Sequence, residues 1–206
     1  MALAVVGLSG GVASGKSTVA ALLARRIPAV HLDADAVARR VLALPAVRAR
    51  VARAFPGVVR GDGTLDREGL ARLVFGDPPA LSRLEAILHP LVRRALERAI
   101  SRARGRFVLL DAPLLQETGA DSLCDRVVYV ACPARVRRRR SMRARGWSGA
   151  EHRAREARQW SCRRKRARSH LVVENAGNET KLKRDVARAA AAIRRLARSR
   201  RATRAR

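Results

Sequence analysis

The sequence predicts an α/β protein with a parallel five-stranded sheet flanked by helices. Three observations support this fold class. Short apolar runs alternate with longer stretches whose apolar residues recur every three or four positions, as in strands and amphipathic helices. The first apolar run, residues 3–8, leads directly into a glycine-rich turn and a helical pattern. The run at 106–115 is apolar almost throughout, which is typical of a buried parallel strand.

The expected elements follow in order along the chain, and their alternation favours parallel strands joined by helices. Pro45 divides one helical stretch, and Pro133 opens an arginine-rich helical zone. Strands are expected at 3–8, 29–35, 106–115, 126–132 and 169–175. Helices are expected at 16–26, 36–55, 65–75 and 79–104, through 133–168, and from 179 onward.

Two segments, 42–104 and 138–167, are longer than a simple connection between strands. Both leave the sheet after the carboxyl end of a strand, where ligands bind in open α/β folds. We therefore expect a core formed by 1–41, 105–137 and 168–206, with the two long segments as additions that serve the site.

The glycine-rich turn reads G-x-x-x-x-G-K-S from Gly10 to Ser17. Its glycines let successive N–H groups point inward at an anion, and the following helix adds its positive end. Lys16 is expected to reach the β- and γ-phosphates of ATP, and the Ser17 hydroxyl to hold Mg²⁺. The pattern predicts a P-loop NTPase or kinase fold without naming a reaction. The residues expected to bind ATP are Gly11, Val12, Ala13, Ser14, Gly15, Lys16, Ser17 and Thr18.

Acidic residues follow two of the predicted strands. Asp33 and Asp35 end the second strand, and Asp111 lies near the end of the third. Carboxyl ends of parallel strands face the same crevice, so these acids are expected to supply a metal site and a base for phosphoryl transfer. If the chain is still extended here, Asp33 and Asp35 point the same way. We assign the base to Asp35 and metal contacts to Ser17, Asp33 and Asp111; alternatively, Asp33 or Asp35 caps the next helix.

Composition restricts the function class. The chain is 48% hydrophobic, so it should fold as a globule, and no apolar run is long enough to cross a bilayer. Its net charge of +28 rests almost wholly on arginine, because only four of the 45 basic residues are lysines. We attribute this charge to compositional bias and polyphosphate substrates rather than to nucleic-acid binding. Three cysteines without metal-type spacing favour a reducing, cytoplasmic compartment. A monomer is expected, with an oligomer as the open alternative.

Several separated pieces of the chain match one family in the same order. They are "GLSGGVASGKST", "LDADAVAR", "DGTLDREGLARLVF", "LEAILHPLVR", "APLLQETG" and "RQW" with "KRARSHLVVENAG". With these pieces the chain resembles the dephospho-CoA kinase family along nearly its whole length. The resemblance implies transfer of the ATP γ-phosphoryl group to the ribose 3′-hydroxyl of dephospho-CoA. The products would be coenzyme A and ADP, in the last step of coenzyme A synthesis.

The resemblance also implies roles for individual residues. Segment 42–104 would be a helical acceptor-binding insert and 138–167 a lid, in which Arg143 or Arg145 meets the transferring phosphate. Asn175 would lie near the adenine, unless it is an ordinary turn residue. His89 either contacts the acceptor or ends a helical turn before Pro90, and Glu117 either contacts the acceptor or pairs locally. The acceptor is expected to contact Ser9, Asp35, Arg67, His89, Pro113, Leu114 and Glu117.

Two departures from the family pattern bear on the site. Ala13 replaces a glycine that is common in the loop, which is harmless if the backbone there needs only right-handed or extended dihedrals. Gln116 stands where Phe is frequent, and it could alter packing around the acceptor. Two other functions fit fewer of the residues. A small kinase for another nucleoside or metabolite would explain the loop and the acids alone, and a nucleic-acid-binding ATPase would explain the charge.

Overall fold

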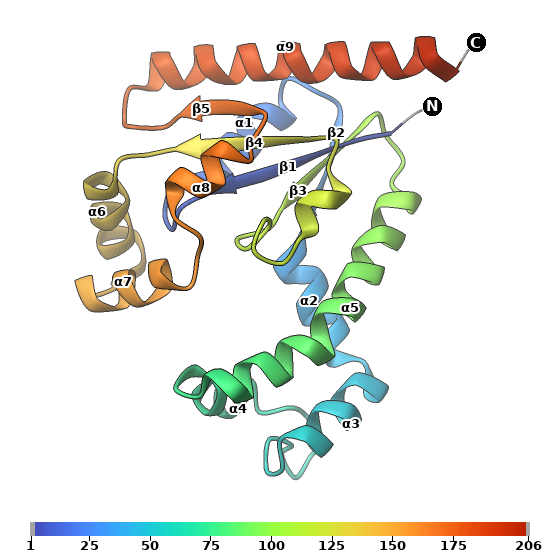
Figure 1. Ribbon diagram of the computed structural model, residues 1–206, viewed down its shortest axis with the longest axis vertical. Helices are drawn as coiled ribbons and strands as arrows, with labels where there is room; N and C mark the ends of the chain where they lie inside the picture. Colours follow the sequence, from blue (N-terminus) through green and yellow to red (C-terminus); the bar gives the residue numbers. More distant parts are fainter. Residues whose placement is uncertain (1–2, 205–206) are drawn as a thin grey trace. The chain divides into compact units, whose positions relative to one another are not determined.

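The computed structural model describes residues 3–204, except for the side chains of Phe75 and of residues 197–204. Five parallel strands form one sheet in the order β2-β3-β1-β4-β5 (Figure 1). The predicted α/β fold with a five-stranded parallel sheet is therefore confirmed. The strands are β1 (Ala4–Gly10), β2 (Ala29–Asp33), β3 (Phe107–Asp111), β4 (Arg126–Ala131) and β5 (Leu171–Glu174).

The strand order places β1 at the centre of the sheet. The chain leaves β1 for β2 and β3 on one side and then crosses to β4 and β5 on the other side. The carboxyl end of β1 is thus the point where the order reverses, and ligands of open α/β sheets bind at such points. Every residue of β1 is buried.

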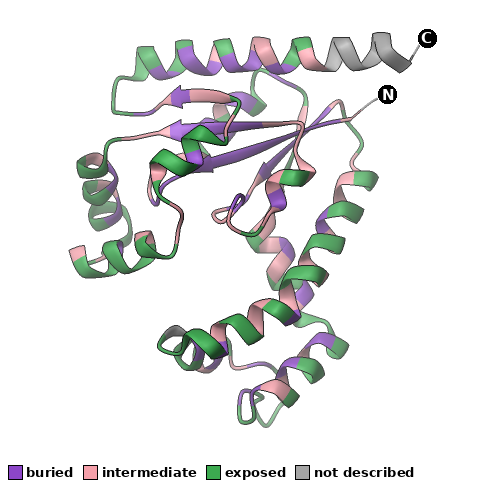
Figure 2. Ribbon diagram, in the orientation of Figure 1, coloured by how far each residue is buried: buried purple, intermediate pink, exposed green. Residues whose placement is uncertain are grey.

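Two helices that are far apart in the sequence pack together against this sheet. Helix α1 (Lys16–Ala24) contributes Val19 and Leu23, and α9 (Glu179–Arg204) contributes Val186 and Ile193 to a buried cluster with the sheet. Figure 2 shows this buried layer along the inner side of α9 and through the strands. These elements belong to one compact unit, the sheet-bearing unit, which consists of the chain up to Asp33 and from Arg102 onward. This unit also contains α6 (Ala134–Arg145), α7 (Gly149–Ala157), α8 (Cys162–Ala167) and a short 3₁₀ helix at Ala120–Leu123.

A second compact unit, Ala34–Ser101, is inserted between β2 and β3. Its helices bury an apolar set of their own that includes Val37, Val51, Phe55 and Leu70. Its helices are α2 (Ala34–Ala43), α3 (Pro45–Ala54), α4 (Arg67–Phe75) and α5 (Pro78–Arg102), of which α5 ends one residue beyond the unit. Within the described chain no helix is both long and apolar enough to cross a membrane.

Three local expectations are corrected by the structure. Strand β2 ends at Asp33, and Asp35 lies in the first turn of α2, so the chain is not extended through both acids. Strand β3 ends at Asp111 rather than near 115. Helix α5 continues through Pro90, so His89 does not end a helical turn there. The helix bends along its length (Figure 1), as expected where proline removes one backbone hydrogen bond.

Candidate active site

The phosphate loop connects β1 to α1 and takes the conformation that its glycines permit. Gly15 has a φ of 88°, in the left-handed region, and a Cβ atom there would collide with the Asn175 side-chain amide. Inside the loop, the Ser14 N–H donates to the Gly11 carbonyl over 3.2 Å. Only glycine fits at position 15, because both the backbone dihedral and the close neighbour exclude a side chain.

Ala13 has a φ of 56° and is the described chain's only non-glycine residue with positive φ. The condition under which alanine would be harmless, a right-handed or extended backbone, is therefore not met. An L-residue in the left-handed region is destabilised by about 1–2 kcal/mol relative to the right-handed region. The loop holds this strained conformation two residues before Gly15, which also has a positive φ.

Asn175 stabilises the loop through its side-chain amide. Its side-chain Nδ2 donates to the Ser14 carbonyl over 2.9 Å, and its Oδ1 accepts from Arg140 over 3.3 Å. Arg140 also donates to the Ser14 carbonyl over 3.4 Å. Asn175 is buried, and these contacts tie its side chain to the loop.

Arg137 is a second buried support of the loop that sequence analysis missed. Its Nε donates to the Cys132 carbonyl over 3.1 Å, and its guanidinium forms an ion pair with Glu156. A Cβ atom on Gly11 would lie 2.7 Å from the Arg137 Nη1. Arg137 lies within a run of arginines, and only its burial distinguishes it from its neighbours.

Lys16 lies at the start of α1 and donates to the Gly10 carbonyl over 3.4 Å. Burial lowers the pKa of Lys16 from its ordinary value to about 8. Asp111 and, less strongly, Glu117 raise this pKa, whereas Lys165 and Arg145 lower it further. Ser17 and Thr18 follow in the first turn of α1 and are exposed.

Asp33 and Asp111 are paired neighbours at the carboxyl ends of β2 and β3. Burial raises the pKa of the Asp111 carboxyl, Lys16 and His31 act to lower it, and Asp33 raises it. His31 Nε2 lies 3.9 Å from an Asp111 carboxylate oxygen. The structure thus brings Lys16, Asp33 and Asp111 together as expected, and it adds His31, for which the sequence carried no motif.

The two lid candidates lie in different surroundings. The charge of Arg145 acts on Lys16, and its guanidinium lies 4.7 Å from the centre of the Trp147 ring. Arg155 stacks on the same ring at 4.2 Å. Arg143 instead lines an open hollow of about 630 Å³ on α6, together with Arg135, Arg138, Arg139 and Met142.

The acceptor candidates divide between the two compact units. Asp35, Arg67 and His89 belong to Ala34–Ser101, where Arg67 donates to the Arg39 carbonyl over 3.3 Å and His89 is exposed on α5. Ser9, Pro113, Leu114 and Glu117 belong to the sheet-bearing unit.

Ser9 and Glu117 are held by internal partners. The Ser9 side chain is buried, and its hydroxyl donates to Gln116 over 2.7 Å. Glu117 Oε1 accepts from the Trp160 N–H over 2.8 Å and lies 2.9 Å from Lys165 Nζ. Glu117 is thus paired inside the protein, but with Lys165, which is remote in sequence, and not with a local partner. Gln116 and Lys165 were not assigned to the site because their partners are remote in sequence.

Comparison with known proteins identifies the family of the chain. Residues 4–181 match the family model for dephospho-CoA kinase. A dephospho-CoA kinase from Anaeromyxobacter dehalogenans is 50% identical over 180 residues, 84% of each chain. One from Thermus thermophilus is 44% identical over 180 residues, 87% of each chain.

Solved structures agree with this fold. The structure described as TT1252 from Thermus thermophilus superimposes with a TM-score of 0.80 at 41% identity, covering 94% of this chain and 97% of that chain. A dephospho-CoA kinase from Campylobacter jejuni shares the fold, with a TM-score of 0.66 at 19% identity, over 97% of this chain and 100% of that chain. The chain therefore belongs to the dephospho-CoA kinase family.

Proposed function

We propose that the protein transfers the γ-phosphoryl group of ATP to the ribose 3′-hydroxyl of dephospho-CoA. The products are coenzyme A and ADP, and the reaction is the last step of coenzyme A synthesis. The observation that carries this proposal is the phosphate loop with Lys16 beside Asp33 and Asp111, in a chain that belongs to this family. The proposed phosphoryl donor site and the acidic groups thus lie together at the carboxyl ends of β1, β2 and β3.

On the donor side, the loop from Gly11 to Thr18 binds the phosphates through its N–H groups and the start of α1. Lys16 offsets the charge of the β- and γ-phosphates. Asp111 helps to keep Lys16 protonated at neutral pH, because its carboxylate raises the Lys16 pKa and so opposes the effect of burial. Asn175, which holds the loop through the Ser14 carbonyl, would lie near the adenine.

The chemistry of the site fits Mg²⁺. Among the side chains that the structure describes, no three His, Cys, Asp or Glu residues gather as a metal site. Magnesium in phosphoryl-transfer sites needs only one or two carboxylates, with phosphates and waters as its other ligands. Ser17, Asp33 and Asp111 offer hard oxygen atoms of this kind and would hold the ion. When bound, Mg²⁺ neutralises charge that develops on the transferring phosphate.

On the acceptor side, we propose that Asp35 accepts the proton of the ribose hydroxyl. Phosphoryl transfer is loose, so a carboxylate within hydrogen-bond reach suffices. Arg67 and His89 would contact the acceptor from the inserted unit, and Pro113, Leu114 and Glu117 from the stretch after β3. Ser9 would act by way of Gln116, since its hydroxyl donates to that side chain. The compactness of Ala34–Ser101 supports an acceptor insert at 42–104.

A lid formed by 138–167 would close over the phosphates, with Arg145 or Arg143 at the transferring group. We propose a reducing, cytoplasmic compartment from the odd number of cysteines and their lack of metal-type spacing.

The proposed function is tested by coupled ADP release with dephospho-CoA, adenosine or single-stranded RNA in parallel. We expect saturation at low substrate only with dephospho-CoA, and loss of turnover in Lys16→Ala with an unchanged circular dichroism spectrum. Release that depends on adenosine would favour another metabolite kinase, and release that depends on RNA would favour a nucleic-acid-binding ATPase. Equal turnover by Lys16→Ala would contradict the role of the phosphate loop.

A further inference from the structure

Helix α8 lies between the phosphate loop and the stretch 113–117. A Cβ atom on Gly11 of the loop would lie 3.0 Å from the Cys162 sulfur, which places the first residue of α8 against the loop. One helical turn later, Lys165 reaches the stretch after β3. Helix α8 therefore contacts the donor loop at one residue and the proposed acceptor stretch at another.

Lys165 is almost wholly buried, although its ammonium carries a charge. Its Nζ lies 2.9 Å from Glu117 Oε1 and donates to the Gln159 side chain over 3.0 Å and to the Pro113 carbonyl over 3.4 Å. Three acceptors use the three donors of an ammonium group. Burying such a group is costly, so its presence calls for a role that apolar packing would not supply.

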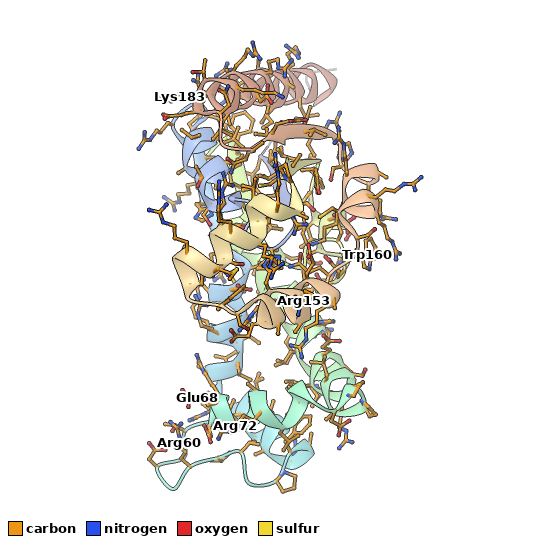
Figure 3. The ribbon with its side chains drawn as sticks, turned by 90° about the vertical axis from the view of Figure 1, so that its left-hand side faces the viewer. Arg60, Glu68, Arg72, Arg153, Trp160 and Lys183 are labelled. Carbon is orange, nitrogen blue, oxygen red and sulfur yellow. The ribbon has the colours of Figure 1, made fainter. Side chains whose placement is uncertain are left out.

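The same contact region is completed by Gln116 and Trp160. Gln116 donates to the Lys165 carbonyl over 3.1 Å and accepts from Ser9 at the end of β1. The Trp160 N–H donates to Glu117, and its ring stacks on Arg164 of α8 at 3.5 Å. Figure 3 labels Trp160 beside the segment that leads into α8. Both ends of the stretch Pro113–Glu117 are thus tied to residues 159–165.

We infer that Lys165 is a positioning residue that fixes the stretch 113–117, and hence the acceptor, at a set distance from the phosphate loop. This inference rests on the proposed function, because it takes 113–117 as acceptor-binding. The donor loop keeps its own supports, Asn175, Arg140 and Arg137, when Lys165 is changed. Loss of Lys165 should therefore weaken use of the acceptor and leave ATP binding intact.

The test compares Lys165→Met with the double variant Lys165→Met/Glu117→Gln. Lys165→Met alone leaves the Glu117 carboxylate buried without its cation, so we expect a lowered melting temperature. The double variant removes both charges, and its melting temperature should recover toward that of the wild type. We expect its KM for dephospho-CoA to stay about tenfold or more above the wild-type value, with the Kd for ATP unchanged. Because Glu117 is itself a proposed acceptor contact, a raised KM in the double variant supports the inference only when Lys165→Arg, which keeps Glu117, shows it as well. A purely structural pair would instead restore the acceptor KM together with the stability.

Lys165→Arg gives a second measurement, because it keeps the charge while its larger head group cannot reproduce the three contacts. A raised acceptor KM with an unchanged Kd for ATP would support the inference even if both methionine variants fail to fold. The matched control is Lys183→Met/Glu179→Gln, an exposed ion pair on α9, which should leave both constants unchanged. Wild-type acceptor KM values in Lys165→Arg or in the double variant would overturn the inference alone. A wild-type protein that makes no coenzyme A would overturn the proposed function and this inference with it.

Discussion

Single residues of the site show how burial and neighbouring charges set its chemistry. Lys16 is half-buried, near the Asp111 carboxylate at the end of β3 and two further cations. Burial disfavours its charged form, and the carboxylate of Asp111 compensates only in part. The protein thus presents an ammonium group that loses its proton well below the ordinary range of lysine, and phosphates arriving at the loop favour the charged form again.

The Lys16 pKa can be measured by trace acetylation of the nucleotide-free protein across pH 6–11. We expect its reactivity to be half-maximal at about pH 8, far below that of a free lysine peptide. Because the pKa is lowered, Lys16 is charged below pH 8 and neutral above it, so ATP affinity should fall as pH rises past 8. A midpoint near the ordinary value of 10.5 would contradict the effect of burial.

Asp33 and Asp35 can be separated by their amide variants. Asp35→Asn keeps the shape and removes the acceptor of the hydroxyl proton, so kcat should fall by about 10² or more with ATP affinity little changed. Asp33→Asn should act mainly by raising the Mg²⁺ concentration that is needed for half-maximal turnover. The measurement is steady-state kinetics of both variants over a Mg²⁺ series. If only Asp33→Asn loses turnover, the roles are reversed, and if both stay active the base lies elsewhere.

Ala13 offers a stability test. Ala13→Gly removes the steric cost of a left-handed φ, which stabilises the folded state. It also gives the unfolded chain more conformational freedom, which lowers stability by a smaller amount. The free energy of unfolding should rise by about 0.5–1 kcal/mol, measured by urea denaturation. As a control, Ala131→Gly replaces an alanine at the end of β4, where φ is not positive, and should lower it. A lower midpoint for Ala13→Gly would show that the loop does not strain this residue.

Whole elements were predictable where the pattern is local. Alternating apolar runs place all five strands, and Pro45 and Pro133 mark helix starts as expected. Element ends were less predictable, because hydrophobic spacing cannot tell the last residue of β2 from the first turn of α2, where Asp35 lies. Pro90 wrongly suggested the end of a helical turn at His89. Helix α5 has 25 residues, and its backbone hydrogen bonds on either side of Pro90 outweigh the one that proline removes.

The residues of the candidate site were likewise predictable only where a local sequence pattern marks them. Strand ends indicated Asp33 and Asp111, and the loop motif indicated Lys16. The links from Ser9 to Gln116 and from Gln116 to Lys165 span 107 and 49 residues, so no local pattern announces them. Arg137 lies among identical neighbours, and burial alone sets it apart.

On α6, the two candidate lid arginines should differ in their effect on turnover. Arg145 acts on Lys16, whereas Arg143 lines the hollow on α6, so the two charges serve different regions. Arg145→Ala should lower kcat by about 10², the effect of losing one charge-stabilising donor, with little change in acceptor KM. Arg143→Ala serves as its matched control and should be near wild type. Equal losses in both variants, or none in either, would contradict this assignment.

The whole molecule carries a net charge of +28, while both proposed substrates carry several negative charges. Such a field raises the rate at which anions meet the protein, and added salt screens it. We expect kcat/KM for dephospho-CoA to fall several-fold between about 50 and 300 mM NaCl, with kcat nearly constant. A salt-independent kcat/KM, measured with uncharged buffer components and fixed Mg²⁺, would show that the arginines do not steer the substrates.

The inserted unit Ala34–Ser101 begins where β2 ends and returns to the sheet a few residues before β3 begins, and these two strands are hydrogen-bonded neighbours. Its two attachment points are therefore held by the sheet itself, whatever the length of chain between them. Lengthening a connection whose ends are already fixed changes the closure entropy only slowly, by about 0.6 kcal/mol for each doubling. One continuous stretch of the gene thus encodes the unit to which we assign acceptor contacts, and its length can change with little effect on the closure entropy of the connection between these strands.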